Sequence, residues 1–462
     1  MNDAVSSCKT SVSMSRRSFS LTVVLAGQHR NFLADLVTRF AVLAPPFPSH
    51  AAAIEALASV LIDRGHEVLW LQQQDVRTQL KDARIRFVAV GARTHPTGSL
   101  AGILDRAAHP DGLLGLVRVI RDVASSTAML CDEAPAHVAE FRIEAVIADQ
   151  MEAAGGLVAR SLALPFVSVA CALPVNREPA IPLPVMPWPY AQDEFGLHRN
   201  AASERIHDWL MRPLARVIAA QCVRLHVAGR QTLAECVSPL LQISQTTPDF
   251  DFPRNAAGPG FHHVGPLRPP AAPTTALPYE LSEGKPFVFA SLGTLQGGRL
   301  KLFLRIARAC RAVDAQLLVA HCGGLDPRGV AALRRAGATW VVDFAPQRAV
   351  LARADLLITH AGLNTVMDGL AAGVPMLAMP IAFDQPGIAA RLVRCGAGIR
   401  LAPAASRRAI ERAVRTLLGD PQYRRRSAAL GAQVHNAPGT QGAADLVERM
   451  VERHRSEAPA HA

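Results

Sequence analysis

The chain has 462 residues, of which 50% are hydrophobic, 19% are charged and 5% are aromatic. At ~150 residues per domain, this length predicts two or three domains, and the apolar content excludes a mainly disordered chain. Lysine and arginine outnumber aspartate and glutamate by 49 to 38, so the net charge is +11. A basic chain is compatible with binding of nucleic acid, anionic lipid or a phosphorylated ligand, but composition bias and solubility are the preferred explanation.

Residues 1–36 differ from the rest of the chain. The segment Ser-Arg-Arg-Ser-Phe at 15–19, followed by the apolar run 21–26, resembles a twin-arginine export signal. The run is short, residues 28–30 interrupt it, and no small-x-small cleavage site follows. We therefore expect an extension of low structural importance, of the kind that an early start codon adds.

The globular pattern begins near Arg39 and alternates between strands and helices. Apolar runs predict buried strands at 40–44, 68–71, 87–90, 145–148 and 166–170. After the first strand, Ile54, Leu57 and Leu61 recur at helical spacing, and Gly65 is typical of a helix end. This alternation is typical of a parallel sheet covered by helices on both faces.

Two proline-rich stretches interrupt the alternation. Residues 172–190 contain six prolines among apolar side chains and predict an extended loop. Helical spacing returns at 206–220. The stretch 248–278 is rich in proline and glycine, which makes it the predicted domain boundary.

The alternation then resumes, with strands predicted at 287–290, 316–320, 340–342, 356–359 and 376–379 and helices at 300–312, 363–372 and 387–394. The tail is predicted to be helical from 406 to 452, with breaks near 419–421 and 438–439, and the arginines between 407 and 426 are expected on a solvated helix face. We therefore predict an α/β protein with two doubly wound domains joined by a linker. A ligand is expected between them, at the carboxyl ends of the strands.

Two common nucleotide-binding signatures do not occur. The loop after the first strand reads Pro-Pro-Phe-Pro-Ser-His, and prolines lack the N–H donors that bind a pyrophosphate. Neither G-x-G-x-x-G nor G-x-x-x-x-G-K-[ST] is present, so a nicotinamide enzyme or a P-loop NTPase is poorly supported. A nucleic-acid binder is not favoured either, because no recognisable module accompanies the charge and aromatic residues are few.

The most informative stretch is 344–385, which reads FAPQRAVLARADLLITHAGLNTVMDGLAAGVPMLAMPIAFDQ. The N-terminus of its predicted helix at 363 offers free N–H groups and the positive end of the helix dipole, which suit a diphosphate, and Gly362 allows close approach of the backbone. The polar side chains placed to contact a nucleotide sugar are His360, Asn364, Asp368, Asp384 and Gln385. Each alone is compatible with helix capping or ordinary loop polarity, but their spacing together favours a nucleotide-sugar site.

The segment HAGLNTVMDGLAAGVPMLAMPIAFDQPG resembles the donor-binding signature of inverting, nucleotide-sugar-dependent glycosyltransferases of the GT-B fold. This family includes plant and animal UDP-glycosyltransferases and bacterial macrolide glycosyltransferases, and the resemblance covers residues ~37 to ~450. The segments VIADQMEAAGGLVA and LPFVSVACALPVNREPAIPLPVMPWPY are similar to the carotenoid branch, the bacterial zeaxanthin glucosyltransferases. The resemblance implies an acceptor-binding domain at 37–262 and a nucleotide-sugar-binding domain with C-terminal helices at 263–462.

The resemblance also implies how the donor UDP-glucose is held. Phe344 stands where the family has an aromatic residue, often Trp, that stacks on uracil, and Ala345 presents its backbone to the base edge. Gln347 reaches the ribose, and Asp368, commonly Glu in the family, binds the ribose diol. The residues implied to contact the diphosphate and the sugar are Ser291, Gly293, Thr294, His360, Gly362, Asn364, Thr365, Asp384 and Gln385.

For catalysis, the resemblance assigns His50 as the general base and Asp149 as the aspartate that orients it. From the residues alone, His50 is a helix-start residue. The implied reaction is one in-line displacement, in which the acceptor hydroxyl loses its proton to His50 and UDP leaves, so that a β-glucoside forms. We expect no metal and no cofactor beyond the co-substrate UDP-glucose.

The implied acceptor is a lipophilic hydroxylated molecule such as zeaxanthin. Met186 and Trp188, in the proline-rich loop, are expected to border its site, whereas a loop that only covers the core is the alternative. Another lipophilic acceptor, such as a polyketide or macrolide, a flavonoid or a sterol, stays open. A catalytically silent carotenoid- or lipid-binding protein is the non-enzyme alternative, and the presence of both His50 and Asp149 argues against it.

Eight scattered cysteines without a CxxC pair argue against a disulfide framework or a zinc ribbon and favour a reducing cytoplasm. No apolar run approaches ~20 residues, so we expect no transmembrane helix. Carotenoid diols reside in bilayers, and a peripheral contact at the inner membrane face is therefore compatible with this function. We expect no nucleic-acid partner, and nothing in the sequence indicates an oligomeric state.

Overall fold

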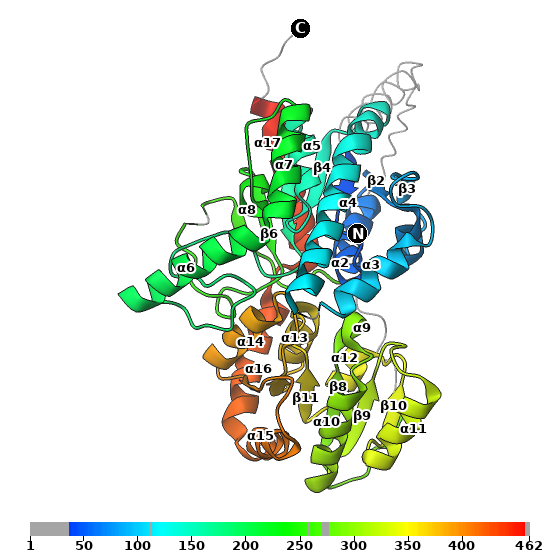
Figure 1. Cartoon of the computed structure of the whole chain (residues 1–462), viewed down its shortest axis with the longest axis vertical. Helices are drawn as coiled ribbons and strands as arrows, with labels where there is room; N and C mark the ends of the chain where they lie inside the picture. Colours follow the sequence, from blue (N-terminus) through cyan, green and yellow to red (C-terminus); the bar gives the residue numbers. More distant parts are fainter. Residues whose placement is uncertain (1–36, 111, 257, 270–276, 458–462) are drawn as a thin grey trace, which may run out of the picture. The chain divides into compact units, whose positions relative to one another are not determined.

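The computed structural model describes residues 37–110, 112–256, 258–269 and 277–457. The predicted extension at 1–36 lies outside these residues. The segment Arg39–Ala462 is one compact unit, and it contains two parallel β-sheets (Figure 1). The predicted α/β fold with two doubly wound domains is confirmed.

The first sheet has seven strands in the order β3-β2-β1-β4-β5-β6-β7. Its strands are β1 (Arg39–Leu43), β2 (Glu67–Gln72), β3 (Arg86–Ala89), β4 (Ala145–Asp149), β5 (Phe166–Ala170), β6 (Leu241–Ser244) and β7 (Phe261–His263). Along β1, Phe40 and Val42 face one hydrophobic core, and Ala41 and Leu43 face the other. A strand buried on both faces needs an uninterrupted apolar run, which is why β1 could be predicted from the sequence.

Helices cover both faces of this sheet. The helices that occur between its strands in the chain are α2 (Pro48–Asp63), the 3₁₀ helix η1 (Gln74–Gln79), α3 (Ser99–Ala108), α4 (Gly112–Glu140), α5 (Ala153–Ser161), α6 (Glu194–Leu210), α7 (Arg212–Arg224) and α8 (Leu233–Cys236), of which α6 projects outward (Figure 1). The helix α2 begins with Pro48, whose fixed φ angle and missing N–H suit a first helical turn. Residues 172–190 contain neither helix nor strand, as their prolines predict.

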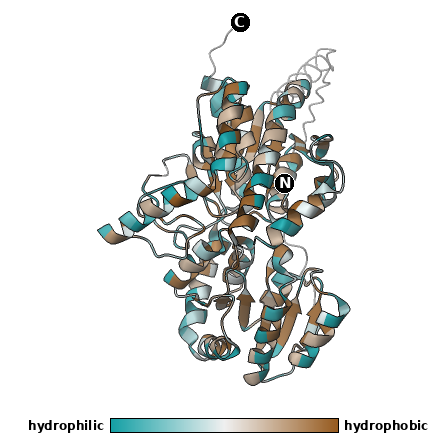
Figure 2. Ribbon diagram, in the orientation of Figure 1, coloured by the Kyte–Doolittle hydropathy of each residue, from teal (hydrophilic) through white to brown (hydrophobic). Residues whose placement is uncertain are grey.

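The second sheet has six strands in the order β10-β9-β8-β11-β12-β13. Its strands are β8 (Phe287–Ser291), β9 (Gln316–Ala320), β10 (Trp340–Val342), β11 (Leu356–Thr359), β12 (Met376–Ala378) and β13 (Gly398–Arg400). Between these strands in the chain lie α9 (Gly293–Gln296), α10 (Leu300–Ala312), α11 (Pro327–Ala336), α12 (Gln347–Leu351), α13 (Leu363–Ala371) and α14 (Gln385–Arg394). After the last strand come α15 (Arg407–Gly419), α16 (Pro421–Asn436) and α17 (Gly439–Glu457). Figure 2 shows hydrophobic strands between helices that carry both hydrophobic and hydrophilic residues.

Three strands were not predicted from the sequence. These are β6, β7 and β13, and β7 lies inside the proline- and glycine-rich stretch at 248–278. Their signals are weak because all three are short and interrupted by polar or small residues: β6 reads Leu-Gln-Ile-Ser, β7 Phe-His-His and β13 Gly-Ile-Arg. The two predicted breaks in the helical tail are confirmed by the ends of α15, α16 and α17, and the arginines between 407 and 426 are exposed or half-buried.

The last helix packs against the first sheet, although the chain order places it after the second. Ala443, Val447 and Val451 of α17 belong to the same core cluster as Phe40 of β1. At the end of α2, Arg64 Nη1 donates to Glu448 Oε2 at 2.6 Å. The apolar face of α17 is therefore buried against the first sheet, although α17 follows the second sheet in the chain.

In each sheet the strand order changes direction at one pair of neighbours, β1 with β4 and β8 with β11. Parallel α/β sheets bind ligands at such switch points, beyond the carboxyl ends of the strands. No helix among the described residues is long and apolar enough to span a membrane.

Candidate active site

His50 and Asp149 lie beyond the carboxyl ends of two neighbouring strands. The loop after β1 leads into α2, whose first turn holds His50, and Asp149 is the last residue of β4. The ring atom Nδ1 of His50 donates to Asp149 Oδ2 at 2.7 Å. The side chain of Asp149 is fully buried, and its other oxygen accepts the backbone N–H of Met151 at 2.8 Å. The carboxylate is thus fixed against the ring.

This contact determines the protonation of His50. A carboxylate only accepts, so Nδ1 carries the proton and Nε2 keeps a free lone pair. Burial by itself lowers the pKa of His50, but the charge and hydrogen bond of Asp149 and the charge of Asp384 raise that pKa overall above 6.5. A histidine in this state can accept a proton from a hydroxyl group near neutral pH.

Cys171, to which the sequence assigned no role, is the third side chain of this site. It follows β5 and is buried, and its Sγ atom lies 3.9 Å from the carbonyl oxygen of His50. Among the described residues, His50, Asp149 and Cys171 form the one cluster of three metal-ligand types, with ligand atoms within 4.8 Å of one another. Burial and the neighbouring Asp149 raise the pKa of the thiol well above 9, so Cys171 is a neutral thiol beside the histidine–carboxylate pair. Metal independence stays a prediction.

Glu152 is a second residue that the sequence reasoning missed. Glu152 is buried, and its Oε1 accepts hydrogen bonds from Thr127 Oγ1 at 2.7 Å and from the N–H of Ala154 at 3.1 Å. Its own backbone N–H donates to the carbonyl of Asp149 at 3.0 Å. Burial raises the pKa of this carboxyl to about 7. Glu152 thus ties the turn after Asp149 to helix α4. The only signal in the sequence is an acidic residue just before a helix.

On the second sheet, His360 follows β11 at the switch point. A Cβ atom on Gly293 or on Gly362 would come within 2.6 Å of the His360 ring, so glycine at both positions lets backbone pack against it. Gly362 caps α13 without a side-chain hydrogen bond, so the first N–H groups of this helix have no side-chain cap. Burial lowers the pKa of His360 to about 4. The ring is therefore neutral, and it can donate a hydrogen bond to a diphosphate but supplies no charge.

The predicted ribose residues form one hydrogen-bonded group. Asp368 Oδ2 accepts Gln347 Nε2 at 2.6 Å, and Gln347 Oε1 accepts the hydroxyl of Thr365 at 3.5 Å. The other oxygen of Asp368 accepts Arg268 Nε at 3.2 Å. Arg268 also donates through Nη1 to Asn364 Oδ1 at 3.1 Å and through Nη2 to the Asn364 carbonyl at 3.0 Å.

Arg268 itself was not predicted, because a linker arginine carries no local signal. It lies after β7, in the segment that joins the two sheets, and its side chain is 20% exposed. Its contacts place a cation among the residues predicted to bind the ribose and the diphosphate. Both oxygens of Asp368 already have protein partners, so a ribose diol would have to share this carboxylate with Arg268 and Gln347.

Phe344 follows β10 with 70% of its surface exposed. A large exposed ring on a loop offers a stacking surface for a base. Ala345 beside it is half-buried, Ser291 at the end of β8 is buried, and Thr294 is exposed. The Oγ of Ser291 accepts the N–H of Gly293 at 3.4 Å, which closes the loop after β8.

Asp384 and Gln385 follow β12 at the start of α14. The side-chain oxygen of Gln385 accepts the N–H groups of Ile381 and Ala382 at 2.8 and 2.9 Å, so its amide nitrogen is the atom left for a sugar. Asp384 Oδ2 accepts the backbone N–H of Leu173 at 3.0 Å, and burial raises the pKa of this carboxyl.

The two sheets contribute to one site. In addition to the Leu173–Asp384 bond, Asn364 Nδ2 donates to the carbonyl of Ser49 at 3.4 Å, next to His50 in the chain. The residues predicted from the second sheet are therefore brought close to His50 on the first sheet.

The proline-rich loop 172–190 is partly buried and partly accessible. Leu173 belongs to the core of the second sheet, and Ile181 packs with Phe252 of the segment between the sheets. Met186 and Trp188 are only half-buried, and the Trp188 ring lies 4.5 Å from the guanidinium carbon of Arg199. Part of the loop thus covers the core, as the alternative interpretation proposed, while the predicted acceptor residues stay partly accessible.

The relation of the chain to known proteins follows from three comparisons. The family model for UDP-glucoronosyl and UDP-glucosyl transferase matches residues 41–440. The chain belongs to this family. The family implies an enzyme that uses a UDP-sugar donor and an acceptor, as the resemblance in the sequence predicted.

Curated members of the family include two bacterial relatives. A zeaxanthin glucosyltransferase of Pantoea ananas is 47% identical over 416 residues, which cover 90% of this chain and 96% of the relative. A zeaxanthin glucosyltransferase of Pseudescherichia vulneris is 44% identical over 90% of this chain and 98% of its own length.

Solved structures of glycosyltransferases share the fold. The calicheamicin glycosyltransferase CalG4 superposes with a TM-score of 0.71 at 20% identity, over 92% of this chain and 100% of that one. The glycotransferase of kitacinnamycin gives a TM-score of 0.70 at 21% identity, over 90% and 99% of the two chains. These likenesses confirm the GT-B architecture of this family member.

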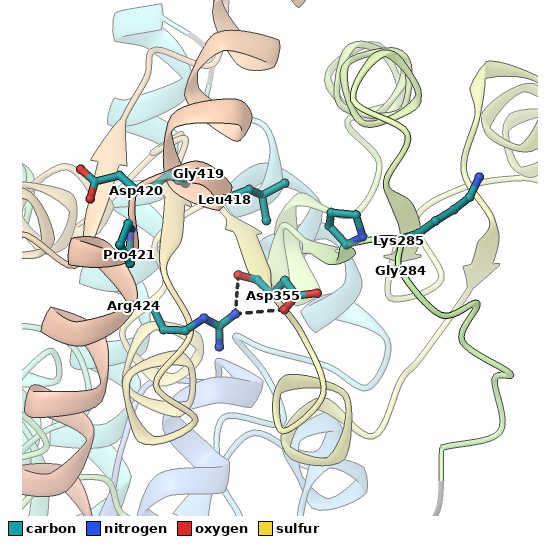
Figure 3. Close-up of a pocket in the computed structure, with 10 residues that line it drawn as sticks. Gly284, Lys285, Asp355, Leu418, Gly419, Asp420, Pro421 and Arg424 are labelled. Carbon is teal, nitrogen blue, oxygen red and sulfur yellow. Dashed lines mark hydrogen bonds and ion pairs between the residues drawn. The ribbon is translucent and has the colours of Figure 1, made fainter.

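A cavity of about 620 Å³ lies elsewhere in the second domain (Figure 3). Lys285 and Asp355, which line it, directly precede β8 and β11, so the cavity is at the amino ends of these strands. Arg424 Nη2 donates hydrogen bonds to the backbone carbonyl of Asp355 at 3.0 Å and to its carboxylate at 3.2 Å. This cavity is therefore at the opposite edge of the sheet from His360 and Asp384.

Proposed function

We propose that this chain transfers glucose from UDP-glucose to the hydroxyl groups of zeaxanthin or a closely related carotenoid diol, giving β-glucosides. The observation that carries the transferase part is the 2.7 Å hydrogen bond between His50 and Asp149, which leaves Nε2 of the ring free to take a proton. The acceptor is supported by the 47% identity to a zeaxanthin glucosyltransferase over 90% of the chain.

In the proposed reaction, the acceptor O–H gives its proton to Nε2 of His50 while its oxygen bonds to the anomeric carbon. The bond from that carbon to the β-phosphate oxygen breaks, and its electron pair leaves with UDP. Asp149 stabilises the imidazolium that forms. The uncapped N-terminus of α13 and the neutral ring of His360 stabilise charge that grows on the leaving diphosphate.

The donor assignment has two parts. The exposed ring of Phe344 is proposed to stack on uracil, and the group around Asp368 to bind the ribose. Asp384 and the amide nitrogen of Gln385 are proposed to bond the glucose hydroxyls. We propose a cytoplasmic location, supported by the seven described cysteines, which are all free thiols.

The test is incubation of the full chain with UDP-glucose and detergent-dispersed zeaxanthin, followed by mass spectrometry of the products and NMR of the anomeric configuration. Mono- and diglucosides with a β linkage are expected. UDP-galactose, dTDP-glucose and GDP-glucose serve as donor controls, and equal turnover with the latter two would refute the uridine assignment.

Acceptor controls separate the alternatives. A macrolide, a flavonoid and a sterol are offered in parallel with zeaxanthin. Glucosylation of one of these without glucosylation of zeaxanthin would replace the carotenoid assignment. Binding of zeaxanthin with no transfer to any acceptor would support the silent binding protein instead.

A further inference from the structure

Helix α6 carries an exposed apolar stripe. Phe195, Ile206 and Trp209 are 75%, 60% and 53% exposed, although globular proteins rarely expose several large apolar side chains together. With Ala202, which is half-buried, these residues stand at positions i, i+7, i+11 and i+14. This spacing places all four on one face of the helix.

The charges of α6 are divided around this stripe. At 100° per residue, His198 and Arg205 border it on the solvent side, and both are exposed. Glu204 and Asp208 lie on the face of the helix opposite the stripe, where Asp208 accepts hydrogen bonds from the guanidinium of Arg177 at 2.8 and 2.5 Å. Glu194, the first residue of the helix, is exposed and lies next to Arg205 around the helix axis. The border of the stripe thus carries His198 and Arg205 with one acidic residue, and the other two acidic residues lie on the far face.

The position of α6 connects it to the predicted acceptor loop. Figure 1 shows α6 extending outward from the helices that cover the first sheet. The helix follows the loop 172–190 in the chain, and its Arg199 lies 4.5 Å from the ring of Trp188. The stripe and the half-buried Trp188 therefore belong to neighbouring parts of one surface.

We propose that this face of α6, formed by Phe195, Ala202, Ile206 and Trp209 with His198 and Arg205, docks on an anionic lipid bilayer. Helices with aromatic and aliphatic residues on one face and basic residues at its border lie in the headgroup region of such membranes. The net charge of +11 acts in the same direction, because anionic leaflets attract basic proteins.

A second copy of the chain fits this surface less well. Stable dimers bury roughly 800 Å² per partner with few charges at the centre, whereas this stripe is one helix wide and has charged groups along its edge. The docking would bring the chain to a diol dissolved in the bilayer and present that diol beside Trp188. Only this link to the acceptor rests on the proposed function.

The experiment is flotation of the full chain with two kinds of vesicle, phosphatidylcholine alone and phosphatidylcholine with phosphatidylglycerol. The test variant combines Phe195→Ser, Ile206→Ser and Trp209→Ser. The matched control is Val223→Ser on α7, because Val223 is 78% exposed but lies outside the stripe. Thermal unfolding of each variant shows that it is folded.

We expect the wild type and the control to float with anionic vesicles and the triple variant to bind at least about tenfold more weakly, because its apolar anchors are gone. Binding to phosphatidylcholine alone should be weaker for all three. Wild-type chain that does not bind anionic vesicles, or a triple variant that binds like the wild type, would overturn the proposal. So would a dimeric wild type that becomes monomeric in the triple variant.

The vesicle assay contains neither donor nor acceptor, so its result is independent of the proposed reaction. A chain that glucosylates dispersed zeaxanthin but does not float would refute the docking alone. A chain that floats but transfers no glucose would refute the proposed function alone.

Discussion

Asp384 and Leu173 are 211 residues apart, yet the carboxylate of the first accepts the backbone N–H of the second at 3.0 Å. This bond joins the residue predicted to bind the sugar, on the second sheet, to the loop predicted to border the acceptor, on the first. The charge of Asp384 also contributes to the raised pKa of His50. Asp384 is thus connected to the loop 172–190 by a hydrogen bond and to His50 by its charge.

Two substitutions of Asp384 separate its proposed contact with the sugar from its hydrogen bond with Leu173. Asp384→Ala should raise KM for UDP-glucose and lower turnover, because the sugar loses a hydrogen-bond acceptor, while calorimetry should show nearly unchanged binding of UDP. Asp384→Asn keeps an oxygen that can accept the N–H of Leu173 and should lose less. If both variants lose UDP affinity as strongly as UDP-glucose affinity, Asp384 does not act on the sugar.

Removing the proposed base should affect turnover far more than donor binding. His50→Ala is expected to lower kcat by roughly 100- to 10,000-fold, the usual contribution of a positioned base. Asp149→Asn should lose less, since the ring remains in place without its charged partner. The measurements are steady-state rates and calorimetric UDP affinity, and near-wild-type turnover in His50→Ala would place the base elsewhere.

On its acidic side, the pH–rate profile should follow the protonation of His50. Only the neutral ring accepts a proton, so activity falls as the pH decreases through the pKa, which lies above 6.5 in the folded chain. In Asp149→Asn the charge that raises this pKa is gone while burial still lowers it. The limb should therefore move to lower pH in this variant, and a limb that stays in place would mean that another group titrates.

Arg268 should contribute to donor affinity. Arg268→Ala is expected to raise KM for UDP-glucose about tenfold to a hundredfold, equivalent to ~1.5–3 kcal/mol for hydrogen bonds to charged groups. Arg268→Lys should not restore it fully, because one ammonium cannot reproduce contacts made from three guanidinium nitrogens. Arg348→Ala, at an exposed arginine of α12, is the control and should behave like the wild type.

The acceptor loop should discriminate between acceptors. Met186→Ser combined with Trp188→Ser is expected to weaken the use of zeaxanthin-like diols, because a long apolar molecule loses contact area. Small soluble phenols, where they are accepted, should be much less affected. If both acceptor classes decline together with the thermal midpoint, the two side chains only stabilise the fold.

The elements predicted best are three strands of the second sheet. The ranges expected at 316–320, 340–342 and 356–359 are those of β9, β10 and β11. Strands packed between two layers of helices are rich in apolar residues, and such a run can be recognised from the local sequence. The strands β7 and β13 were missed because they read Phe-His-His and Gly-Ile-Arg and contain no apolar run, whereas the equally short β10 reads Trp-Val-Val.

The sequence by itself determined the fold class, the helix N-terminus at Leu363 and the glycines beside His360, because backbone geometry and burial impose local patterns. Only the tertiary structure decided which residues meet. The strand order puts β1 beside β4, so that His50 reaches Asp149, and it puts Cys171 next to both. Arg268 reaches Asp368 across 100 residues, and α17 returns to the first core. Such pairings depend on how the sheets are assembled, and no periodicity within one segment encodes them.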